Sequence, residues 1–379
     1  MKIAFLTTDN REQQNQYERS APFFGPAPTA VLEGFAQLDG DLEVHVISCT
    51  RRPMPAPRKL ADHIWFHQPV VPRAGWGRTI FSGCVMAVRK VLREIQPDLV
   101  HGQGTERDCA MSAVLSGYPN VLTIHGIMRA VAKAQGAKTL SYYGMATLLE
   151  RFAIGRTAGV FCNSAYTESQ IAPFARQTWR VPNCIRGEFF APLPDPAFRK
   201  RRVVVLGSII HYKQSLEILK MWRGVAERHH DVILTFVGRS GGDRYSQEFR
   251  DLLTDPVLSG KAEHIEWLEA DELIPLLDST RGMIHFPTEE SFGLAVAEGL
   301  ARNLKLFASR TGGVPDVAHG CDGVEFFAAN DWPGLSRAAG RWLEEGMPVV
   351  NSNPTIASRF SPIAVASKHL EIYRSVLNR

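Results

Sequence analysis

The amino-acid sequence predicts an α/β fold in which doubly wound parallel sheets form two separate domains. Three observations support this prediction. Short apolar segments alternate with helix-length segments throughout the chain, which is typical of parallel sheets. Segments such as 203–206 and 232–234 are apolar at every position, as expected for strands that helices cover on both faces. A Pro-rich stretch then divides the chain near its middle.

The first domain is expected to span residues 1–186. The polar segment 7–24 separates its first strand from its first helix, and because connections of this length are usually functional, we expect it to face an acceptor. Residues 102–107 either line the same region or form a simple turn. The strands of this domain are expected at 2–7, 43–48, 64–71, 98–101, 121–125, 159–163 and 178–182.

The second domain is expected to span residues 202–361, after a Pro-rich linker at 187–201 that would act as a semi-rigid spacer. Apolar residues at helical spacing predict a final helix at 362–379. Because ligands bind beyond the carboxyl ends of parallel strands, functional residues should follow the strand ends directly. The strands of this domain are expected at 202–207, 232–238, 264–268, 282–287, 304–308 and 324–327.

The composition is that of a soluble globular protein, with 45% hydrophobic and 22% charged residues. No apolar run reaches the roughly 18 residues that a membrane span needs. The apolar start of the chain is too short for a signal peptide, so we expect a cytoplasmic location. The six cysteines are scattered without a CxxC pair, which favours reduced, mostly buried thiols over a zinc site or a disulfide framework.

Charge is distributed unevenly between the two halves. Residues 1–190 carry 21 Lys and Arg against 15 Asp and Glu, whereas residues 191–379 carry 22 against 24. A basic first half is compatible with an anionic acceptor or with peripheral contact to an acidic membrane surface, and equally with an uneven solvated surface. The basic residues are dispersed and no recognisable binding module surrounds them, so nucleic acid is not an expected partner.

Residues 286–298 are the most informative segment. A strand ends near 287, a loop follows, and a helix begins near Gly293, so that loop amides and the helix dipole together predict a phosphate site. Glu290 lies in the loop, where it can meet sugar hydroxyls. Glu298 lies about one and a half turns into the helix, where it can accept both hydroxyls of a ribose. Taken singly, each carboxylate is better explained as a solvated or capping residue. The donor-binding residues predicted around this anion site are Ser291, Phe292, Gly293 and Leu294.

This segment resembles the E-x7-E signature of the family 4 retaining glycosyltransferases, which have the GT-B fold. Glu290 and Glu298 are separated by seven residues within a Pro-Thr-x-Glu-x-Phe-Gly-Leu pattern. Downstream, residues 299–303 are similar to the family's Glu-Ala-Met-Ala-x-Gly segment. Residues 309–316 are similar to its Gly-Gly-x-Pro-Glu turn, with Asp316 in place of Glu. The resemblance implies two Rossmann-like domains that face a central cleft, with the final helix crossing back onto the first domain.

Residues 203–213 resemble the strand and loop that hold the donor diphosphate in this family. Lys213 matches the family's lysine, six residues after Gly207. The arginine expected directly after Gly207 is Ser208 in this chain, so one of two cationic contacts is missing or is supplied from elsewhere. Gly238 fits the family's glycine-containing turn near the nucleotide.

Arg239, Trp267 and His125 each allow a functional and a purely structural interpretation. Arg239 is interpreted as a solvated loop residue rather than a substitute cation, and Trp267 as a core residue rather than a platform for the base. In the first domain, His125 follows a strand within a Thr-x-His-Gly sequence. The resemblance implies that His125 faces the donor sugar.

The resemblance implies a retaining hexosyltransferase that acts in glycan or glycoconjugate biosynthesis. Its donor would be a UDP-, GDP- or ADP-linked sugar, and its acceptor an unidentified glycan, lipid-linked molecule or small molecule. The acceptor would attack on the face from which the diphosphate leaves, without a side-chain nucleophile, a metal or a cofactor. The sequence Asp39-Gly40-Asp41 precedes a strand and is interpreted as a turn, not a metal site. The predicted catalytic residues are His125, Lys213 and Glu290.

Competing functions are distinguished by sequence features. A nicotinamide-dependent dehydrogenase is disfavoured because the first strand is not followed by G-x-G-x-x-G. A phosphorylase is disfavoured by the chain length and by the absence of its cofactor lysine. Two alternatives remain open: a GT-B relative that epimerises nucleotide sugars, and a non-catalytic protein that binds them.

Overall fold

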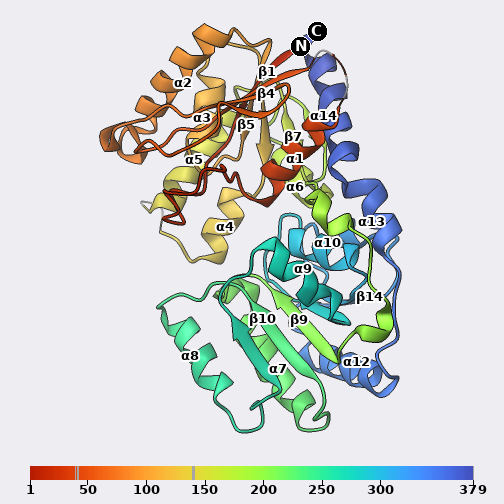
Figure 1. The fold of residues 1–379 in the computed structure, drawn as a ribbon. Coiled ribbons are helices and arrows are strands. Elements are labelled where there is room, and N and C mark those ends of the chain that lie inside the picture. The colour runs from red at the N-terminus through yellow and green to blue at the C-terminus, as the bar shows by residue number, and fades with distance from the viewer. Residues whose placement is uncertain (39, 41, 139–140, 379) are drawn as a thin grey trace. The chain divides into compact units, whose positions relative to one another are not determined.

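The computed structural model describes residues 1–38, 40, 42–138 and 141–378 (Figure 1). The chain forms two compact units. Unit 1 consists of Met1–Arg186 and Phe360–Arg379, and unit 2 of Gly187–Arg359. Among the described residues, no helix combines the length and the apolar character that crossing a membrane requires.

Unit 1 is built on an eight-stranded sheet with the order β3-β4-β2-β1-β5-β6-β7-β8. Neighbouring strands are parallel, except that β3 and β4 form an antiparallel pair at one edge. The strands are β1 (Lys2–Leu6), β2 (Glu43–Ile47), β3 (Lys59–Ala61), β4 (Ile64–His67), β5 (Leu99–Gln103), β6 (Asn120–Ile124), β7 (Val160–Cys162) and β8 (Thr178–Arg180). The helices are α1 (Pro26–Ala36), α2 (Ser82–Ile95), α3 (Asp108–Val114), α4 (Met128–Ala134), α5 (Tyr142–Ile154), α6 (Ala165–Ile171) and α14 (Pro362–Leu377).

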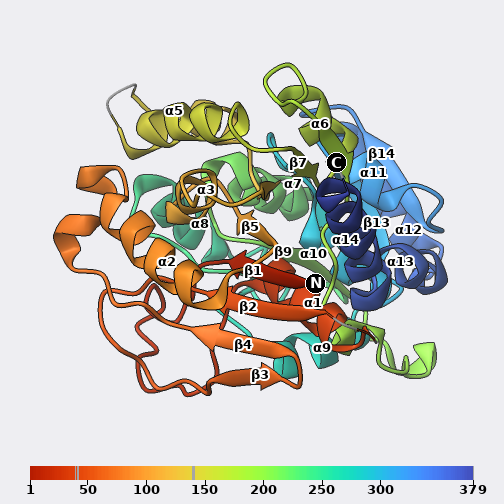
Figure 2. The ribbon, with the colours of Figure 1, turned by 90° about the horizontal axis from the view of Figure 1, so that it is seen from above.

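Alternate residues of β1 point to opposite faces of this sheet. Ile3 and Phe5 join a core that includes α1 and α14, whereas Ala4 and Leu6 join a core that includes α2 and α3. Figure 2 shows α2 and α3 to one side of β1 and α1 and α14 to the other. Burial on both faces explains why this strand is apolar at every position.

The final helix α14 belongs to the core of unit 1 although it follows unit 2 in the sequence. Tyr373 on α14 is fully buried, and its hydroxyl lies 2.5 Å from Nδ1 of His101 on β5. The amide of Ile185 donates to the carbonyl of Phe360 at 2.9 Å, just before the helix begins. These contacts fix residues 360–378 on the sheet of unit 1.

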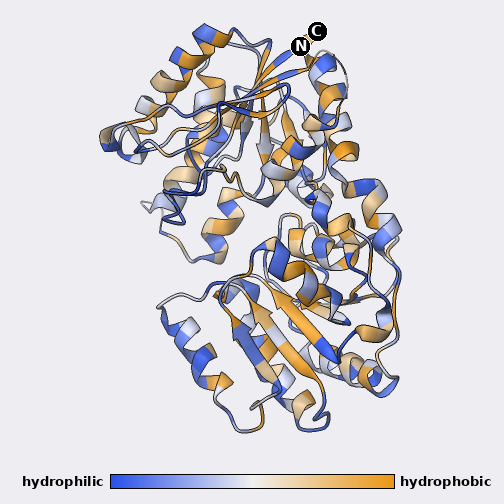
Figure 3. Cartoon of the chain, in the orientation of Figure 1, coloured by the Kyte–Doolittle hydropathy of each residue, from blue (hydrophilic) through white to orange (hydrophobic). Residues whose placement is uncertain are grey.

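Unit 2 is built on a six-stranded, fully parallel sheet with the order β11-β10-β9-β12-β13-β14. Figure 3 shows β9 as largely hydrophobic and the helix α8 as mostly hydrophilic. The strands are β9 (Arg202–Leu206), β10 (Ile233–Val237), β11 (Ala262–Ile265), β12 (Gly282–His285), β13 (Lys305–Ser309) and β14 (Val324–Phe327). The helices are α7 (Ser215–Ala226), α8 (Arg244–Leu253), α9 (Ala270–Asp278), α10 (Leu294–Ala301), α11 (Val314–Ala318), α12 (Trp332–Glu344) and α13 (Asn353–Phe360).

Segment 187–201 is held on unit 2 by two buried arginines. Arg199 donates to three backbone carbonyls of this unit. Arg302 forms a 2.6 Å ion pair with Asp278 and donates to carbonyls within 189–192. Because buried guanidinium groups need several acceptors, this Pro-rich segment is fastened to unit 2 along its length.

Every strand that the sequence predicts corresponds to an observed strand, and the predicted ends of two of them are wrong by three residues or more. The strand predicted at 64–71 ends at His67, and that predicted at 264–268 runs from Ala262 to Ile265. The edge strand Lys59–Ala61 was not predicted. It has three residues and lacks an apolar run, so its sequence carries no strand signal.

Candidate functional site

Two glycine turns lie at the carboxyl ends of the neighbouring strands β9 and β10 in unit 2. Gly207 follows β9, and Gly238 follows β10. A Cβ on Gly238 would lie 2.1 Å from the carbonyl oxygen of Gly207, so only glycine fits at this close approach of two backbones. Ser208, which follows Gly207, is exposed. These turns present backbone rather than bulky side chains, which lets a phosphate or sugar come close to the amides.

Lys213, Glu290 and His285 form a charged cluster beside the first of these turns. Lys213 Nζ lies 2.7 Å from Glu290 Oε2, and His285 Nε2 lies 3.2 Å from the same oxygen. Lys213 ends a short helical turn after β9, and its Cδ lies 3.9 Å from where a Cβ on Gly207 would be. His285 is the last residue of β12 and is buried. The predicted catalytic residues of unit 2 are therefore in direct contact.

The charges in this cluster stabilise one another. Burial raises the pKa of Glu290, but the Lys213 ammonium and the His285 hydrogen bond outweigh burial and hold this pKa far below its usual range. Burial likewise opposes the charge on Lys213, and the Glu290 carboxylate overcomes it, so that the pKa of Lys213 is raised. Burial lowers the pKa of His285, which leaves its imidazole neutral and able to donate to Glu290. Glu290 is thus an anion and Lys213 a cation at neutral pH.

The loop that carries Glu290 is fixed by backbone contacts on two sides. The amide of Thr288 donates to the carbonyl of Tyr212 at 2.8 Å, and the amide of Gly313 donates to the carbonyl of Glu290 at 3.0 Å. A Cβ on Gly312 would lie 1.7 Å from that same carbonyl oxygen. Gly312 is therefore required so that this turn can pack against the Glu290 loop.

Helix α10 begins immediately after this loop. Gly293, with a φ of 102°, is the residue before the helix, and Leu294 is its first residue. Ser291 and Phe292 in the preceding turn are buried. Glu298 lies at the fifth position of the helix and is only 9% exposed, which is unusual for a carboxylate. The predicted anion site and the predicted ribose acceptor thus lie on one short helix.

Trp267 corrects one interpretation of the sequence, whereas Arg239 is an exposed loop residue as expected. Trp267 was expected in the core but is 45% exposed. Arg239 follows Gly238, and its guanidinium carbon lies 4.9 Å from the centre of the Trp267 ring. Instead of a core tryptophan, the loop after β11 carries an exposed one, and it forms a cation–π pair with the exposed arginine after β10.

His125 lies in unit 1, directly after β6. Its Nε2 lies 3.1 Å from Oε1 of Gln103, the last residue of β5, and the Gln103 Nε2 lies 3.0 Å from His101 Nε2. Burial lowers the pKa of His125, although the nearby Glu106 carboxylate opposes this shift. The imidazole is therefore neutral, and the Gln103 oxygen fixes the tautomer that carries hydrogen on Nε2.

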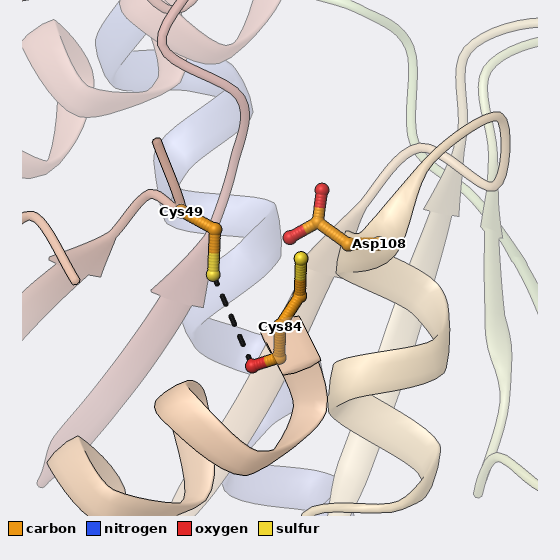
Figure 4. A group of neighbouring side chains, drawn as sticks. All are labelled: Cys49, Cys84 and Asp108. Atoms are coloured by element: carbon orange, nitrogen blue, oxygen red, sulfur yellow. Dashed lines mark hydrogen bonds between the residues drawn. The ribbon is translucent and has the colours of Figure 1, made fainter. Parts of the chain in front are cut away.

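One group of side chains in unit 1 has the composition of a metal site. The ligating atoms of Cys49, Cys84 and Asp108 lie within 4.8 Å of one another, and Cys49 Sγ lies 3.9 Å from the Cys84 carbonyl oxygen (Figure 4). The pKa of Cys49 is raised well above its usual value, chiefly by its contact with Cys84 and by burial, and burial also raises the pKa of Asp108. All six cysteines are free thiols, as predicted. Asp39 and Asp41 lie outside the described residues.

The structure brings the predicted site residues of unit 2 together around the ends of β9, β10 and β12. Sequence reasoning missed His285 and the role of Gly312, and it included Gln103 only within the segment 102–107 without a contact to His125. A polar residue that ends an apolar strand was a usable signal for His285 and Gln103, because ligands gather at that edge of a sheet.

Family models match most of the chain. Residues 31–187 match the model described as Glycosyltransferase Family 4, and residues 200–345 match that described as Glycosyl transferases group 1. The Saccharomyces cerevisiae protein named phosphatidylinositol N-acetylglucosaminyltransferase GPI3 subunit is 22% identical over 271 residues. The match covers 66% of this chain and 57% of the yeast protein, so this chain matches little more than half the length of that relative.

Solved structures share the fold over the whole chain. Sucrose-phosphate synthase from Thermosynechococcus elongatus superposes with a TM-score of 0.78 at 15% identity, covering 100% of this chain and 99% of that one. Anabaena HepE, solved in complex with UDP-glucose, superposes with a TM-score of 0.71 at 16% identity, covering 99% and 100%. At these identities the likeness shows the fold.

Proposed function

This chain belongs to the family 4 glycosyltransferases of the GT-B fold, and from that premise we propose that it transfers a hexose from a nucleoside-diphosphate sugar with retention of configuration. The observation that carries this proposal is the cluster of Lys213, Glu290 and His285, which lies at the carboxyl edge of the unit 2 sheet. It combines a fixed cation and a fixed carboxylate next to the loop that leads into α10.

In this proposal the leaving diphosphate is held by Lys213 and by the amides at the start of α10. Negative charge grows on the diphosphate as the bond to the anomeric carbon breaks, and preorganised donors stabilise that charge without reorganisation. Glu298 accepts the ribose hydroxyls, and Glu290 accepts hydroxyls of the donor sugar. Ser208 supplies a hydroxyl where the family places an arginine.

The acceptor oxygen bonds to the anomeric carbon on the face from which the diphosphate departs, and its proton passes to a departing phosphate oxygen. Glu290 does not serve as general acid in this scheme, because its carboxylate stays ionised. It does not serve as nucleophile either, because the acceptor oxygen attacks the anomeric carbon directly and Lys213 binds the carboxylate. Lys213 supplies positive charge at the diphosphate, so no divalent cation is required. Activity that survives chelation would support this part of the proposal.

The exposed pair of Trp267 and Arg239 is proposed to flank the nucleobase. The indole offers a stacking face, and the guanidinium adds positive charge at the end of β10. UDP is the first nucleotide to test, because a structural neighbour was solved with UDP and with UDP-glucose.

The cellular location of the protein and the chemical class of its acceptor are also part of the proposal. We place the protein in the cytoplasm, in solution or peripheral to the inner face of a membrane. The name of the yeast relative indicates a phosphatidylinositol acceptor for that protein. A phosphate-bearing acceptor is accordingly one candidate class for this chain.

A thermal-shift series with UDP, GDP, ADP and their sugar conjugates tests the proposal. A ligand at a hundredfold excess over its dissociation constant stabilises the protein by about 2.7 kcal/mol. We expect one nucleotide series to shift the melting temperature, and we expect the shift to be lost in Glu298→Ala. Product analysis then separates sugar transfer from epimerisation or from binding without turnover.

A further inference from the structure

Unit 1 contains a large basic pocket that the proposed chemistry does not use. Its volume is about 1180 Å³, larger than most small-molecule sites. It lies among the segments that follow β1, β2, β4 and β5, at the carboxyl edge of the unit 1 sheet. Among its lining residues, Glu12 supplies the single carboxylate against four arginines: Arg51, Arg73, Arg78 and Arg107.

A buried tryptophan holds two of these arginines in place. The guanidinium carbons of Arg51 and Arg107 each lie 5.3 Å from the centre of the Trp76 ring. The indole is anchored by a 3.0 Å hydrogen bond from its Nε1 to the Val71 carbonyl. Two positive charges from different loops are thus held against the same ring, at equal distances from its centre. Stacking on an aromatic ring orders a guanidinium group while its N–H edge stays available to an anion.

The protein does not neutralise this charge. Among the residues that the structure describes, no carboxylate forms an ion pair with Arg51, Arg73, Arg78 or Arg107. Glu12 accepts hydrogen bonds from the backbone amide of Arg51 at 3.3 Å, which leaves the Arg51 guanidinium free of that carboxylate. The pocket therefore presents a net positive charge that an anion can offset.

The rim of the pocket has a strained backbone. Ile80 and Phe81 follow the lining residue Thr79, and both have a left-handed backbone, with φ values of 53° and 61°. Such conformations are costly for β-branched and bulky residues and persist where the surroundings impose them, often at binding sites. The Thr79 hydroxyl donates to the Ala74 carbonyl at 2.8 Å, which closes this loop around Trp76.

We propose that this pocket is the acceptor site and that it binds the phosphate group of a phosphorylated acceptor. The inference rests on the proposed transferase function. Guanidinium forks match phosphate oxygens in pairs, so four arginines can hold a mono- or diester phosphate firmly. The ring of Tyr142, nearly half exposed, and the side chain of Gln13 also line the pocket, where they can contact the sugar or polyol that carries the phosphate. The volume accommodates such a head group together with part of its carrier.

The test measures anion binding by calorimetry while UDP fills the donor site. The soluble probes are glycerol 3-phosphate, glucose 6-phosphate, glucuronate and uncharged methyl glucoside. The vesicle probes are phosphatidylcholine with and without phosphatidylinositol, measured by co-sedimentation. The variant is Arg73→Gln/Arg78→Gln, in which both changed residues are exposed and therefore compatible with folding. The matched control is Arg89→Gln/Arg93→Gln, which removes the same charge from exposed positions on α2 outside the pocket.

We expect a phosphate-bearing probe to bind the wild type and the control equally, and the Arg73→Gln/Arg78→Gln variant at least tenfold more weakly. Binding of the soluble phosphates identifies a phosphosugar-type acceptor, and binding of phosphatidylinositol vesicles alone identifies a lipid-linked one. Equal binding by the pocket variant and the wild type, binding of glucuronate in place of phosphates, or no binding of any probe would overturn the inference. UDP binding, measured first, reports on the proposed transferase function separately.

Discussion

Lys213 Nζ and Glu290 Oε2 lie 2.7 Å apart, and each charge keeps the other ionised in a largely buried setting. The lysine follows β9 and the glutamate follows β12, which are neighbouring strands in the sheet. The two residues therefore meet although their positions in the sequence differ by 77. A donor diphosphate that enters this site meets a lysine that is already oriented. The pair therefore couples the position of the catalytic cation to that of the sugar-binding carboxylate.

Lys213→Met should lower the turnover number by about a hundredfold, because preorganised charge at the leaving group is lost. It should also destabilise unit 2, since the Glu290 carboxylate loses its main counter-charge. Initial rates at saturating donor and melting temperatures measure the two effects. Lys220→Met, at an exposed position on α7, is the control. Unchanged turnover in Lys213→Met would remove this lysine from the mechanism.

Glu298→Ala should weaken nucleotide binding tenfold or more, because hydrogen bonds to a charged acceptor contribute about 1.5–3 kcal/mol each. Glu298 is largely buried, so Glu298→Gln, which keeps the size and one acceptor, serves as a second variant. Calorimetry with UDP measures the affinity, and Glu344→Ala, at an exposed position on α12, is the control. Wild-type affinity in correctly folded Glu298→Ala would show that the ribose binds elsewhere.

The strands of both sheets were predictable because helices cover both faces. In β9, for example, every interior position is apolar, so the strand is visible without knowledge of its neighbours. The edge strand β3 escaped prediction because its three residues form no apolar run. The edge strand β14 is longer and more apolar, and it was predicted although it too has one neighbour.

The site was predictable only in part, for a related reason. Glu290 and Lys213 were found through their sequence pattern, but their ion pair and the hydrogen bond from His285 depend on which strands are neighbours. Trp267 was assigned to the core because tryptophan is apolar, whereas the short β11 leaves it exposed after the strand end. The basic pocket of unit 1 escaped prediction because its arginines come from separate loops, each of which has an ordinary composition.

Gln103→Leu should lower the turnover number while it changes the Michaelis constant for the donor little. Gln103 acts as a positioning residue: its Oε1 holds the Nε2 hydrogen of His125, and leucine keeps the volume without the acceptor. Loss of this contact lets the neutral imidazole change tautomer, so the pH profile of turnover should also shift. Gln103→Glu restores an acceptor and should recover part of the activity. Equal turnover in wild type and Gln103→Leu would show that the orientation of His125 is irrelevant.

Glu150 makes the stability of unit 1 depend on pH. This carboxyl on α5 is buried, accepts from Thr105 Oγ1 at 2.5 Å and from the Met128 amide at 3.2 Å, and has its pKa raised by burial to about 7. The folded state therefore binds the proton more tightly than the unfolded state, whose pKa is near 4.5. The resulting stabilisation is fully present below about pH 4.5 and is lost as the pH rises through about 7.

Glu150→Gln should remove this pH dependence, because the carboxyl that titrates is replaced by an amide. The fold should be kept, since the amide oxygen can occupy the Oε2 position, which accepts both hydrogen bonds. The stability of the wild type relative to the variant should fall by up to about 3 kcal/mol between pH 4.5 and 8, at 1.36 kcal/mol for each unit of pKa shift. Denaturant unfolding at a series of pH values measures this difference, and Glu94→Gln on the exposed face of α2 is the control. Parallel pH curves for the wild type and Glu150→Gln would mean that Glu150 has an ordinary pKa in the folded state, and that α5 and the start of α4 are hydrated at this contact.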